Sequence, residues 1–401
     1  MAEILFLCHR IPYPPNKGDK IRSWHVLRHL ARAHTVHLGC FIDAPEDWVH
    51  RSTLQEICGE CHFEPVEASA LGWRNMVGLA VGKSVTESHF NREGLRRWVE
   101  AIAARGNIAG VYVFSSAMAQ YLSSITGNDI RRVIDFVDLD SEKWRQYAEY
   151  RRPPVRWIYD LEARRLSAYE RAMARLSNFS IFVTESEAEA FRRLAPESSA
   201  KVVTISNGVD TEYFSPDRQY IDPFASGSQA MVFTGAMSYW ANQDAVIWFA
   251  STILPAVRVH EPNAEFWVVG AGPNKAVKRL EQLPGVRVTG AVPDVRPYLA
   301  NATAVVVPMR VGRGVQNKVL EAMAMARPIV ASEIARSGLD AVVSDRELLV
   351  ATTPSAFVKA LRDVLSGSRN LPEQMGRRAR VLVMAHYGWP QNLRRLDELF
   401  V

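Results

Sequence analysis

One stretch of the chain, residues 304–332, constrains the fold more than any other. It begins with the apolar run Ala304–Val307, which has the length and β-branched content of a strand buried on both faces. A loop punctuated by Pro and Gly follows, and a helix is predicted to begin near residues 316–318. Arg327-Pro328 ends this helix, and Ile329–Ala331 begins another strand. This order of elements is typical of an α/β domain with a parallel sheet.

The loop and the start of the helix carry three cations, Arg310, Arg313 and Lys318. Backbone N–H groups at a helix N-terminus, the helix dipole and fixed positive charge together suit a phosphate or a diphosphate. Glu321, one turn into the helix, suits a pair of sugar hydroxyls better than a phosphate. The combination predicts a binding site for a nucleotide diphosphate.

The same stretch resembles the C-terminal signature of the retaining GT-B glycosyltransferases of the family 4 type, which usually reads E-G-x-G-x-x-x-x-E-A-M-A-x-G-x-P-V-V-A. The matching positions are Gly314, Glu321–Ala324, Pro328 and Ile329–Ala331. The resemblance implies that Glu321 binds the ribose of a nucleotide sugar. Arg313 stands where the family has its first Glu, and Arg327 replaces the usual small residue before the Pro. The variant G-x-x-N-K-x-L-E-A-M-A is similar to sugar transferases that accompany PEP-CTERM exopolysaccharide loci.

This resemblance implies a GT-B fold, an α/β architecture of two doubly wound Rossmann-like domains that face each other across a cleft. Residues 207–214 support it, because they resemble the family's N-G-V-D-x-x-x-F turn. Residues 215–229, rich in Pro, Asp, Ser and Gly, are interpreted as a linker. We therefore expect an acceptor-side domain over 1–214, completed by a C-terminal helix at 387–401, and a nucleotide-sugar-binding domain over 215–386.

Length and composition are those of a soluble protein with two domains of ordinary size. The chain has 401 residues, of which 48% are hydrophobic and 23% charged. A net charge of +5 suits an anionic substrate or an anionic membrane surface, and no nucleic-acid-binding motif is present. No apolar run approaches the roughly 18 residues of a membrane span, and the first residues lack the pattern of a signal peptide. We expect a cytoplasmic protein.

Four cysteines predict no disulfide framework. The segment 58–62, Cys-Gly-Glu-Cys-His, fits the C-x-x-C-H pattern of covalent haem attachment. That chemistry requires export, for which the sequence gives no signal. A structural or redox-inert pair of cysteines is the favoured interpretation.

The first domain supplies the candidate catalytic residues. A loop after the strand Ile4–Cys8 carries Gly18, Asp19 and Lys20, and it resembles the family's glycine-rich loop over the donor phosphates and the acceptor. Only one glycine of the usual pair is present, and Asp19 could equally cap the helix that follows.

Asp135 and Asp138 follow another strand, at the edge of the sheet where α/β proteins bind ligands. In the family a His or Asp after this strand faces the donor sugar. Asp138 is therefore the first catalytic candidate, ahead of Asp135 and Asp19. An Asp at a strand end is also a common helix N-cap.

Two segments of the first domain have an unusual composition. Residues 71–98 are apolar, aromatic and weakly basic, which suits a membrane surface, a groove for a lipid-linked acceptor or, the favoured interpretation, an amphipathic helix on the domain. Residues 144–175 are rich in Arg and aromatic side chains. They suit either an anionic acceptor or phospholipid surface, or a helix whose Arg side chains are solvated.

The second domain is expected to hold the donor. After the strand Met231–Gly235, residues 236–242 lack the Arg and Lys with which the family grips the diphosphate, and the cations of the central stretch are hypothesised to replace them. By resemblance, backbone groups near Val292 meet the nucleobase. The predicted donor-binding residues are Gly18, Lys20, Gly235, Val292, Arg310, Gly312, Arg313, Gly314, Val315, Gln316, Asn317, Lys318 and Glu321. No metal site and no cofactor are expected.

The function implied is retaining, metal-independent transfer of a sugar from a nucleotide diphosphate sugar to a glycan or lipid-linked acceptor in cell-surface polysaccharide synthesis. A peripheral contact with the inner membrane is one interpretation of the basic, aromatic segments. Two alternatives stay open: a non-catalytic GT-B scaffold of a polysaccharide assembly complex, and a nucleotide-sugar epimerase of the same fold. The sequence does not identify the base, the sugar, the acceptor or the linkage.

Overall fold

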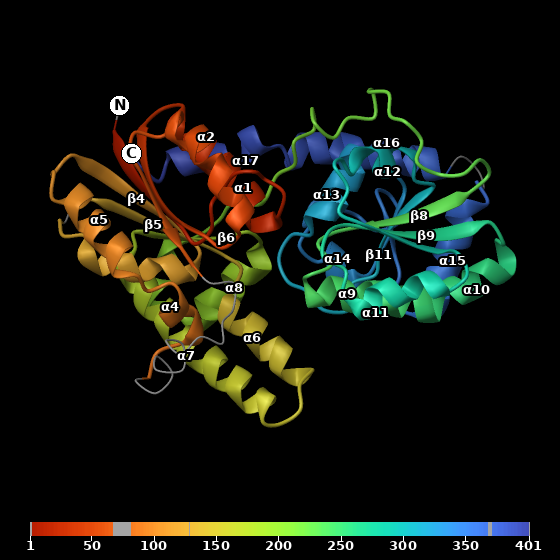
Figure 1. Ribbon diagram of the computed structural model, residues 1–401, viewed down its shortest axis with the longest axis horizontal. Helices are drawn as coiled ribbons and strands as arrows, with labels where there is room; N and C mark the ends of the chain where they lie inside the picture. Colours follow the sequence, from red (N-terminus) through yellow and green to blue (C-terminus); the bar gives the residue numbers. More distant parts are fainter. Residues whose placement is uncertain (1, 67–81, 128, 368–370, 401) are drawn as a thin grey trace. The chain divides into compact units, whose positions relative to one another are not determined.

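A computed structural model describes residues 2–66, 82–127, 129–367 and 371–400. Contacts divide the chain into two units, residues 1–206 with 393–401 (unit 1) and residues 207–392 (unit 2). Each unit is a parallel sheet covered by helices (Figure 1). The expected fold class, two doubly wound Rossmann-like domains, is confirmed.

Over the residues that the structure describes, the sheet of unit 1 has seven strands in the order β3-β2-β1-β4-β5-β6-β7, all parallel. The strands are β1 (Glu3–Cys8), β2 (Thr35–Ile42), β3 (Cys61–Pro65), β4 (Ile108–Phe114), β5 (Arg131–Val137), β6 (Phe179–Phe182) and β7 (Val202–Thr204). The helices of this unit are α1 (Gly18–Ala31), α2 (Arg51–Gln55), α4 (Val85–His89), α5 (Glu93–Ala103), α6 (Asp140–Glu149), α7 (Val155–Leu176) and α8 (Glu185–Leu194).

Short 3-10 helices connect some of these elements, at Pro45–His50, Ser116–Ser124 and Pro196–Lys201. Apolar residues of the central strands pack with α5, α7 and α8 in one buried cluster on one face of the sheet. The last helix, α17 (Trp389–Asp397), begins in unit 2 and ends in unit 1.

In the described part of unit 2, the sheet has six strands in the order β10-β9-β8-β11-β12-β13. They are β8 (Gln229–Thr234), β9 (Ala264–Val269), β10 (Val286–Gly290), β11 (Ala304–Val307), β12 (Ile329–Ala331) and β13 (Leu349–Val350). The helices are α9 (Trp240–Trp248), α10 (Leu254–His260), α11 (Lys275–Lys278), α12 (Arg296–Asn301), α13 (Asn317–Ala324), α14 (Glu333–Arg336), α15 (Pro354–Leu365) and α16 (Leu371–His386). A π-helical turn at Phe249–Ile253 joins α9 to α10, and a 3-10 turn at Arg279–Gln282 follows α11.

Helices cover both faces of this second sheet. Figure 1 shows α9, α10 and α11 on one face and α12, α13 and α16 on the other. The four residues of β11 are all buried, as expected of a central strand covered on both faces. Burial on both faces fixes the strand ends, and with them the loops that leave the carboxyl edge of the sheet.

The two compositionally unusual segments differ in how far the structure describes them. Residues 67–81, which include the start of the 71–98 segment, lie outside the described residues, and the remainder forms α4 and α5. The 144–175 segment lies within α6, the connection 150–154 and α7. Within the described ranges, no helix is both long enough and apolar enough to cross a membrane.

Candidate functional site

The switch point of unit 2 lies between β8 and β11. The chain runs from β8 through β9 to β10 on one side, then crosses to β11, β12 and β13 on the other. Open α/β sheets bind ligands outside the carboxyl ends of the strands at such a point. Gly235 follows β8 directly, and the loop 308–316 follows β11 and leads into α13. The predicted donor residues of both segments therefore meet at one edge of the sheet.

Two glycines allow this edge to close tightly. Gly270, after β9, has a φ of 150°, and a Cβ there would lie 1.9 Å from the carbonyl oxygen of Gly235. Gly235 has a φ of 155°, and its Cβ would lie 2.8 Å from Asn242 Nδ2 and 3.3 Å from Lys318 Cε. Only glycine fits both positions, because L side chains rarely adopt this backbone conformation and no space exists for them. The backbone of the β8 loop is thereby exposed directly to the Lys318 side chain.

Lys318 links the loop after β8 to the first turn of α13. Its ammonium group donates a hydrogen bond to Asn242 Oδ1 at 3.0 Å and lies 4.9 Å from the centre of the Phe233 ring. Asn242 Nδ2 in turn donates to the carbonyl oxygen of Ala236 at 2.9 Å. Asn242 is buried and therefore fixed, so it holds the ammonium group against the loop that follows β8. The hydrogen-bond partner of this lysine is thus a neutral amide.

Burial perturbs both charged side chains of α13. It lowers the pKa of Lys318 to about 8, although the nearby Glu321 carboxylate acts in the opposite direction. It raises the pKa of Glu321 to about 7, and here the charge of Lys318 opposes the shift. The attraction between the two groups does not compensate for the loss of water around each. Perturbation of two groups at a switch point is typical of a functional site.

The N-terminus of α13 adds backbone donors to this position. Its N-cap residue, Gln316, has an extended backbone and makes no side-chain cap hydrogen bond. The N–H groups of the first helical turn face the same edge as Lys318, which suits an anion. Asn317 is held by Asn207, whose Nδ2 donates to Asn317 Oδ1 at 3.1 Å.

The loop before α13 contains the remaining predicted donor residues. Gly314 is buried and has a φ of 66°. A Cβ added to Gly338 would lie 2.3 Å from the carbonyl oxygen of Gly314. Gly312 lies near the Gln316 side chain, and Val315 packs against the core of unit 2. Arg313 is half-buried, and its carbonyl oxygen accepts a hydrogen bond from Gln316 Nε2 at 3.4 Å. Val292, after β10, packs at the edge of the same core.

Arg310 has a different environment from Lys318. Its guanidinium forms a bidentate ion pair with Asp244, in which Nε lies 2.9 Å from Oδ2, and it lies 5.5 Å from the Trp248 ring. Its positive charge is therefore already balanced by a carboxylate.

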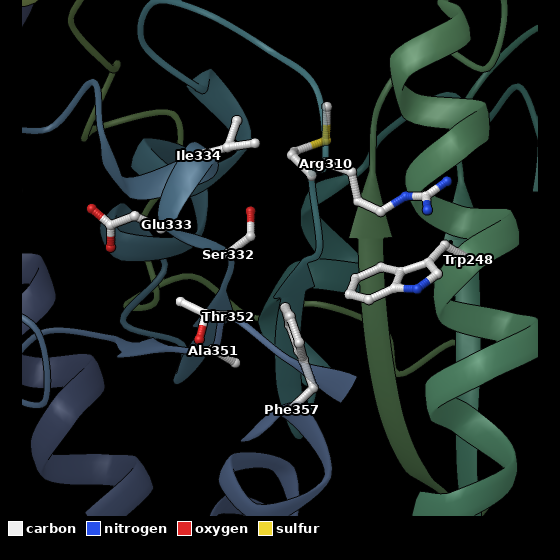
Figure 2. Close-up of a pocket in the computed structure, with 9 residues that line it drawn as sticks. Trp248, Arg310, Ser332, Glu333, Ile334, Ala351, Thr352 and Phe357 are labelled. Atoms are coloured by element: carbon white, nitrogen blue, oxygen red, sulfur yellow. The ribbon is translucent and has the colours of Figure 1, made fainter. Parts of the chain in front are cut away.

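Figure 2 shows Arg310 and Trp248 at a cavity of about 280 Å³. The cavity is lined by Trp248, Met309, Arg310, Ser332, Glu333, Ile334, Ala351, Thr352 and Phe357. Lys318, Glu321 and Gly235 are not among the lining residues. The cavity is thus formed by residues other than the group gathered around Lys318.

In unit 1, Gly18, Asp19 and Lys20 form the first turn of α1 at the carboxyl end of β1. Asp19 is ion-paired with Arg10, and His9 Nε2 lies 3.4 Å from its Oδ2. Burial alone would raise the pKa of Asp19, but the hydrogen bond from His9 and the charge of Arg10 hold it well below its usual range. Asp19 is therefore a firmly ionised carboxylate.

Lys20 points into the interior of unit 1. Its side chain is 1% exposed, and its ammonium group contacts Asp47 Oδ2 at 2.6 Å. Gly18 is exposed at the first residue of α1. The structure thus holds the lysine in an internal ion pair, while the glycine and the aspartate lie at the strand end.

Asp135 and Asp138 lie in contrasting environments at the end of β5. Asp135 is fully buried and accepts hydrogen bonds from Arg22 Nε at 2.7 Å, from the Tyr112 hydroxyl and from the backbone N–H of Val137 at 3.1 Å. Asp138 is partly exposed, and it follows Val137, whose φ is 69°. A β-branched residue with positive φ is a backbone outlier, and such strain clusters at functional sites. These features favour Asp138 over Asp135 as a group that meets a ligand.

Two structural partners of the site were not identified from the sequence. Asn242 lies in residues 236–242, which the sequence marks only by their lack of Arg and Lys, and Gly270 was not among the predicted site residues. Asn242 contacts Lys318 across 76 positions of sequence, which no local pattern indicates. His9 and Arg10, which flank Asp19, could have been found from their position directly after the first strand.

Comparison with protein families identifies residues 228–367 as a match to the family described as Glycosyl transferases group 1. The match lies within unit 2 and contains Gly235, Asn242, Lys318 and Glu321. Comparison with curated protein sequences found no match.

Solved structures that resemble the chain over almost its whole length have low sequence identity. A sucrose-phosphate synthase from Thermosynechococcus elongatus is 14% identical, with a TM-score of 0.72 and coverage of 100% of this chain and 98% of that one. A glycosyltransferase from Rickettsia africae is 14% identical, with a TM-score of 0.69 and coverage of 100% and 97%. Anabaena HepE in complex with UDP-glucose is 13% identical, with a TM-score of 0.69 and coverage of 99% of both chains. These similarities establish the GT-B fold for the whole chain.

Proposed function

We propose that the protein is a retaining, metal-independent glycosyltransferase that moves a sugar from a nucleotide diphosphate sugar to a glycan or lipid-linked acceptor. The observation that carries this proposal is the arrangement of Lys318, Asn242 and Glu321 beside the glycine backbone of the β8 loop. It lies within the part of the chain that matches the glycosyltransferase group 1 family. The proposed setting is cell-surface polysaccharide synthesis in the cytoplasm.

Each group has a defined task in this proposal. The diphosphate lies against Lys318 and the N–H groups at the start of α13, where positive charge is concentrated. The Glu321 carboxylate accepts hydrogen bonds from the two ribose hydroxyls. As the bond to the sugar breaks, negative charge grows on the leaving diphosphate, and the ammonium group and the helix N-terminus stabilise it.

Catalysis also needs a group facing the sugar as it becomes cationic. Asp138 is the proposed carboxylate, because it is partly exposed and follows a strained residue at a strand end. Asp19, ionised beside Arg10 and His9, is the second candidate in the same unit. Asp135 is the weakest of the three, since all of its described contacts lie in the interior of unit 1.

UDP is the first nucleotide to test, because the structures of Anabaena HepE contain UDP or UDP-glucose. The experiment is a thermal-shift series with UDP, GDP and ADP on the wild type, Lys318→Ala and Glu321→Ala. A ligand that binds only the folded state stabilises it by about 2.7 kcal/mol at a concentration of a hundred times its Kd, and this stabilisation raises the melting temperature. We expect one diphosphate to stabilise the wild type and neither variant. The exposed Lys275→Ala is the matched control and should behave as the wild type.

A non-catalytic scaffold is the second candidate, and two observations favour it. Residues 236–242 contain neither Lys nor Arg, and Arg313 occupies the position of the first motif Glu. If no diphosphate stabilises the wild type even at millimolar concentration, the donor site has been lost and the scaffold becomes the better assignment. If a nucleotide sugar binds but is converted without an acceptor, analysis of the sugar product will identify an epimerase.

A further inference from the structure

The connection between α6 and α7 forms the tip of a helical hairpin in unit 1, and its residues are unusually exposed. Every residue from Glu149 to Ile158 is exposed to solvent, in the sequence Glu-Tyr-Arg-Arg-Pro-Pro-Val-Arg-Trp-Ile. Figure 1 shows this tip at the end of the hairpin that points away from the sheet of unit 1. We call residues 149–158 the hairpin tip.

Large apolar side chains of the hairpin tip are in water. Trp157 is 66% exposed, Tyr150 58%, Ile158 48% and Val155 41%. Of the tryptophans in the described part of the chain, Trp157 is the one that is exposed. A contiguous group of exposed apolar side chains on a folded protein marks an interaction surface.

The stem of the hairpin, by contrast, is firmly packed. Ser141 donates to the buried Glu170 from its hydroxyl at 2.5 Å and from its backbone at 3.2 Å, which joins α6 to α7. The rings of Trp144 and Tyr159 meet edge to face at 5.0 Å between centroids. The Glu162 carboxylate accepts hydrogen bonds from the first backbone N–H groups of α4, which fixes α7 to the domain. The exposure of the tip is therefore a property of a rigid projection.

The charge of the hairpin tip identifies the kind of partner. Arg151, Arg152 and Arg156 accompany the apolar side chains, and the carboxylates beside them are Glu149 and Asp160, whose Oδ2 lies 3.8 Å from Arg156 Nε. Trp and Tyr prefer the boundary between water and lipid, where the ring is apolar on one side and polar on the other. Arginine beside them meets lipid phosphates, and each such side chain contributes about fivefold to binding of an anionic surface.

We propose that the hairpin tip docks unit 1 on an anionic phospholipid bilayer. Trp157 and Ile158, on the first turn of α7, insert at the level of the headgroups, and Arg152 and Arg156 contact the phosphates. An apolar protein partner would match the tryptophan but not the arginines, and an acidic protein would match the arginines but not the aliphatic side chains. The mixture of both at the end of a rigid hairpin fits a membrane interface best. This inference does not depend on the donor site in unit 2.

The test is sedimentation of the full chain with vesicles of phosphatidylcholine alone or with added phosphatidylglycerol. We expect binding to the phosphatidylglycerol vesicles only, and weaker binding as salt is raised, because salt screens the arginines. Arg152→Gln with Arg156→Gln should reduce the binding constant by roughly 25-fold, because two side chains that contribute about fivefold each are removed. Trp157→Ser with Ile158→Ser should also reduce it strongly. The emission of Trp157 should move to shorter wavelength when phosphatidylglycerol vesicles are added.

Matched controls remove exposed residues of the same kinds elsewhere. The control variants are Ile221→Ser and Arg193→Gln. Ile221 is 88% exposed, and the Arg193 side chain is 72% exposed. These variants should bind vesicles as the wild type does. Equal loss in the controls and the tip variants, or equal binding to both kinds of vesicle, would overturn the proposal. Absence of binding to either kind of vesicle would also overturn it. If the wild type dimerises and Trp157→Ser abolishes the dimer, the hairpin tip is instead the contact with a second copy of the chain. Nucleotide binding, measured separately, should be the same in all of these variants.

Discussion

Replacing Glu321 by Gln should make the protein more stable at mildly alkaline pH while it removes donor binding. Burial raises the pKa of this carboxyl group from 4.5 to about 7, so the folded state disfavours the ionised form. Glutamine has nearly the same shape but never ionises. The substitution therefore removes the free-energy cost of ionising this carboxyl group in the folded state.

The size of the effect follows from the pKa shift. A change from 4.5 to about 7 corresponds to about 3 kcal/mol of lost stability once the group is ionised in both states. Because the folded pKa is the higher one, the stabilising contribution is complete below the unfolded pKa and is lost as pH rises through about 7. At about pH 8 the variant should gain about 3 kcal/mol, or roughly 6–12 °C in Tm for a unit of this length. At about pH 5 the gain should fall to about 1 kcal/mol or less.

The assay is thermal unfolding of the wild type and Glu321→Gln at both pH values, with and without the diphosphate that stabilises the wild type. Glu373→Gln is the control, since the Glu373 side chain is 67% exposed, and it should show no dependence of this kind. An equal change in Tm at the two pH values, or a loss of stability at the alkaline one, would refute a partly buried, proton-sensitive carboxyl group at this position.

Two further predictions concern the charged groups of each unit. Donor affinity should be greatest between about pH 7 and pH 8, because binding requires an ionised Glu321 and a protonated Lys318. Calorimetry across this range should show the affinity falling at alkaline pH in the wild type. In Lys318→Arg this alkaline fall should disappear. A wild-type affinity unchanged well above pH 8 would contradict this assignment. In unit 1, Arg22→Met leaves the buried Asp135 carboxylate without its ion-pair partner and should cost about 3–5 kcal/mol in chemical denaturation, most of which the double variant with Asp135→Leu should recover. A double variant as unstable as the single one would show that the carboxylate is not the cause.

Much of the fold was predictable because parallel strands covered on both faces consist of continuous runs of apolar residues. The run Ala304–Val307 is β11, Ile329–Ala331 is β12, and the helix expected from residues 316–318 begins at Asn317. The strand expected at Ile4–Cys8 begins one residue earlier, at Glu3, which pairs with Thr35 of β2. Such differences at element ends reflect backbone pairing, which side-chain patterns do not report.

The contacts of the candidate site were less predictable, because long-range packing decides them. The sequence placed Lys20 near a phosphate site, but its partner Asp47 lies 27 positions further along the chain and draws the side chain inward. Asp135 was a candidate for its position at a strand end, and Arg22, 113 positions away, meets it in the interior. Local patterns identify the edge of the sheet where ligands bind, whereas the choice between an internal ion pair and a ligand-binding charge depends on which residues pack against it.

That distinction gives a physical criterion for the donor site. Lys20 and Arg22 are buried with a carboxylate in hydrogen-bond contact, so their charge is matched within the protein. Lys318 differs, because its hydrogen bond goes to the neutral amide of Asn242, and burial lowers its pKa despite the nearby Glu321. A cation in this state gains stability when an anion arrives, since the anion supplies the missing countercharge and restores the protonated form. Among Lys20, Arg22 and Lys318, Lys318 is therefore the cation to which a diphosphate would supply the missing negative charge.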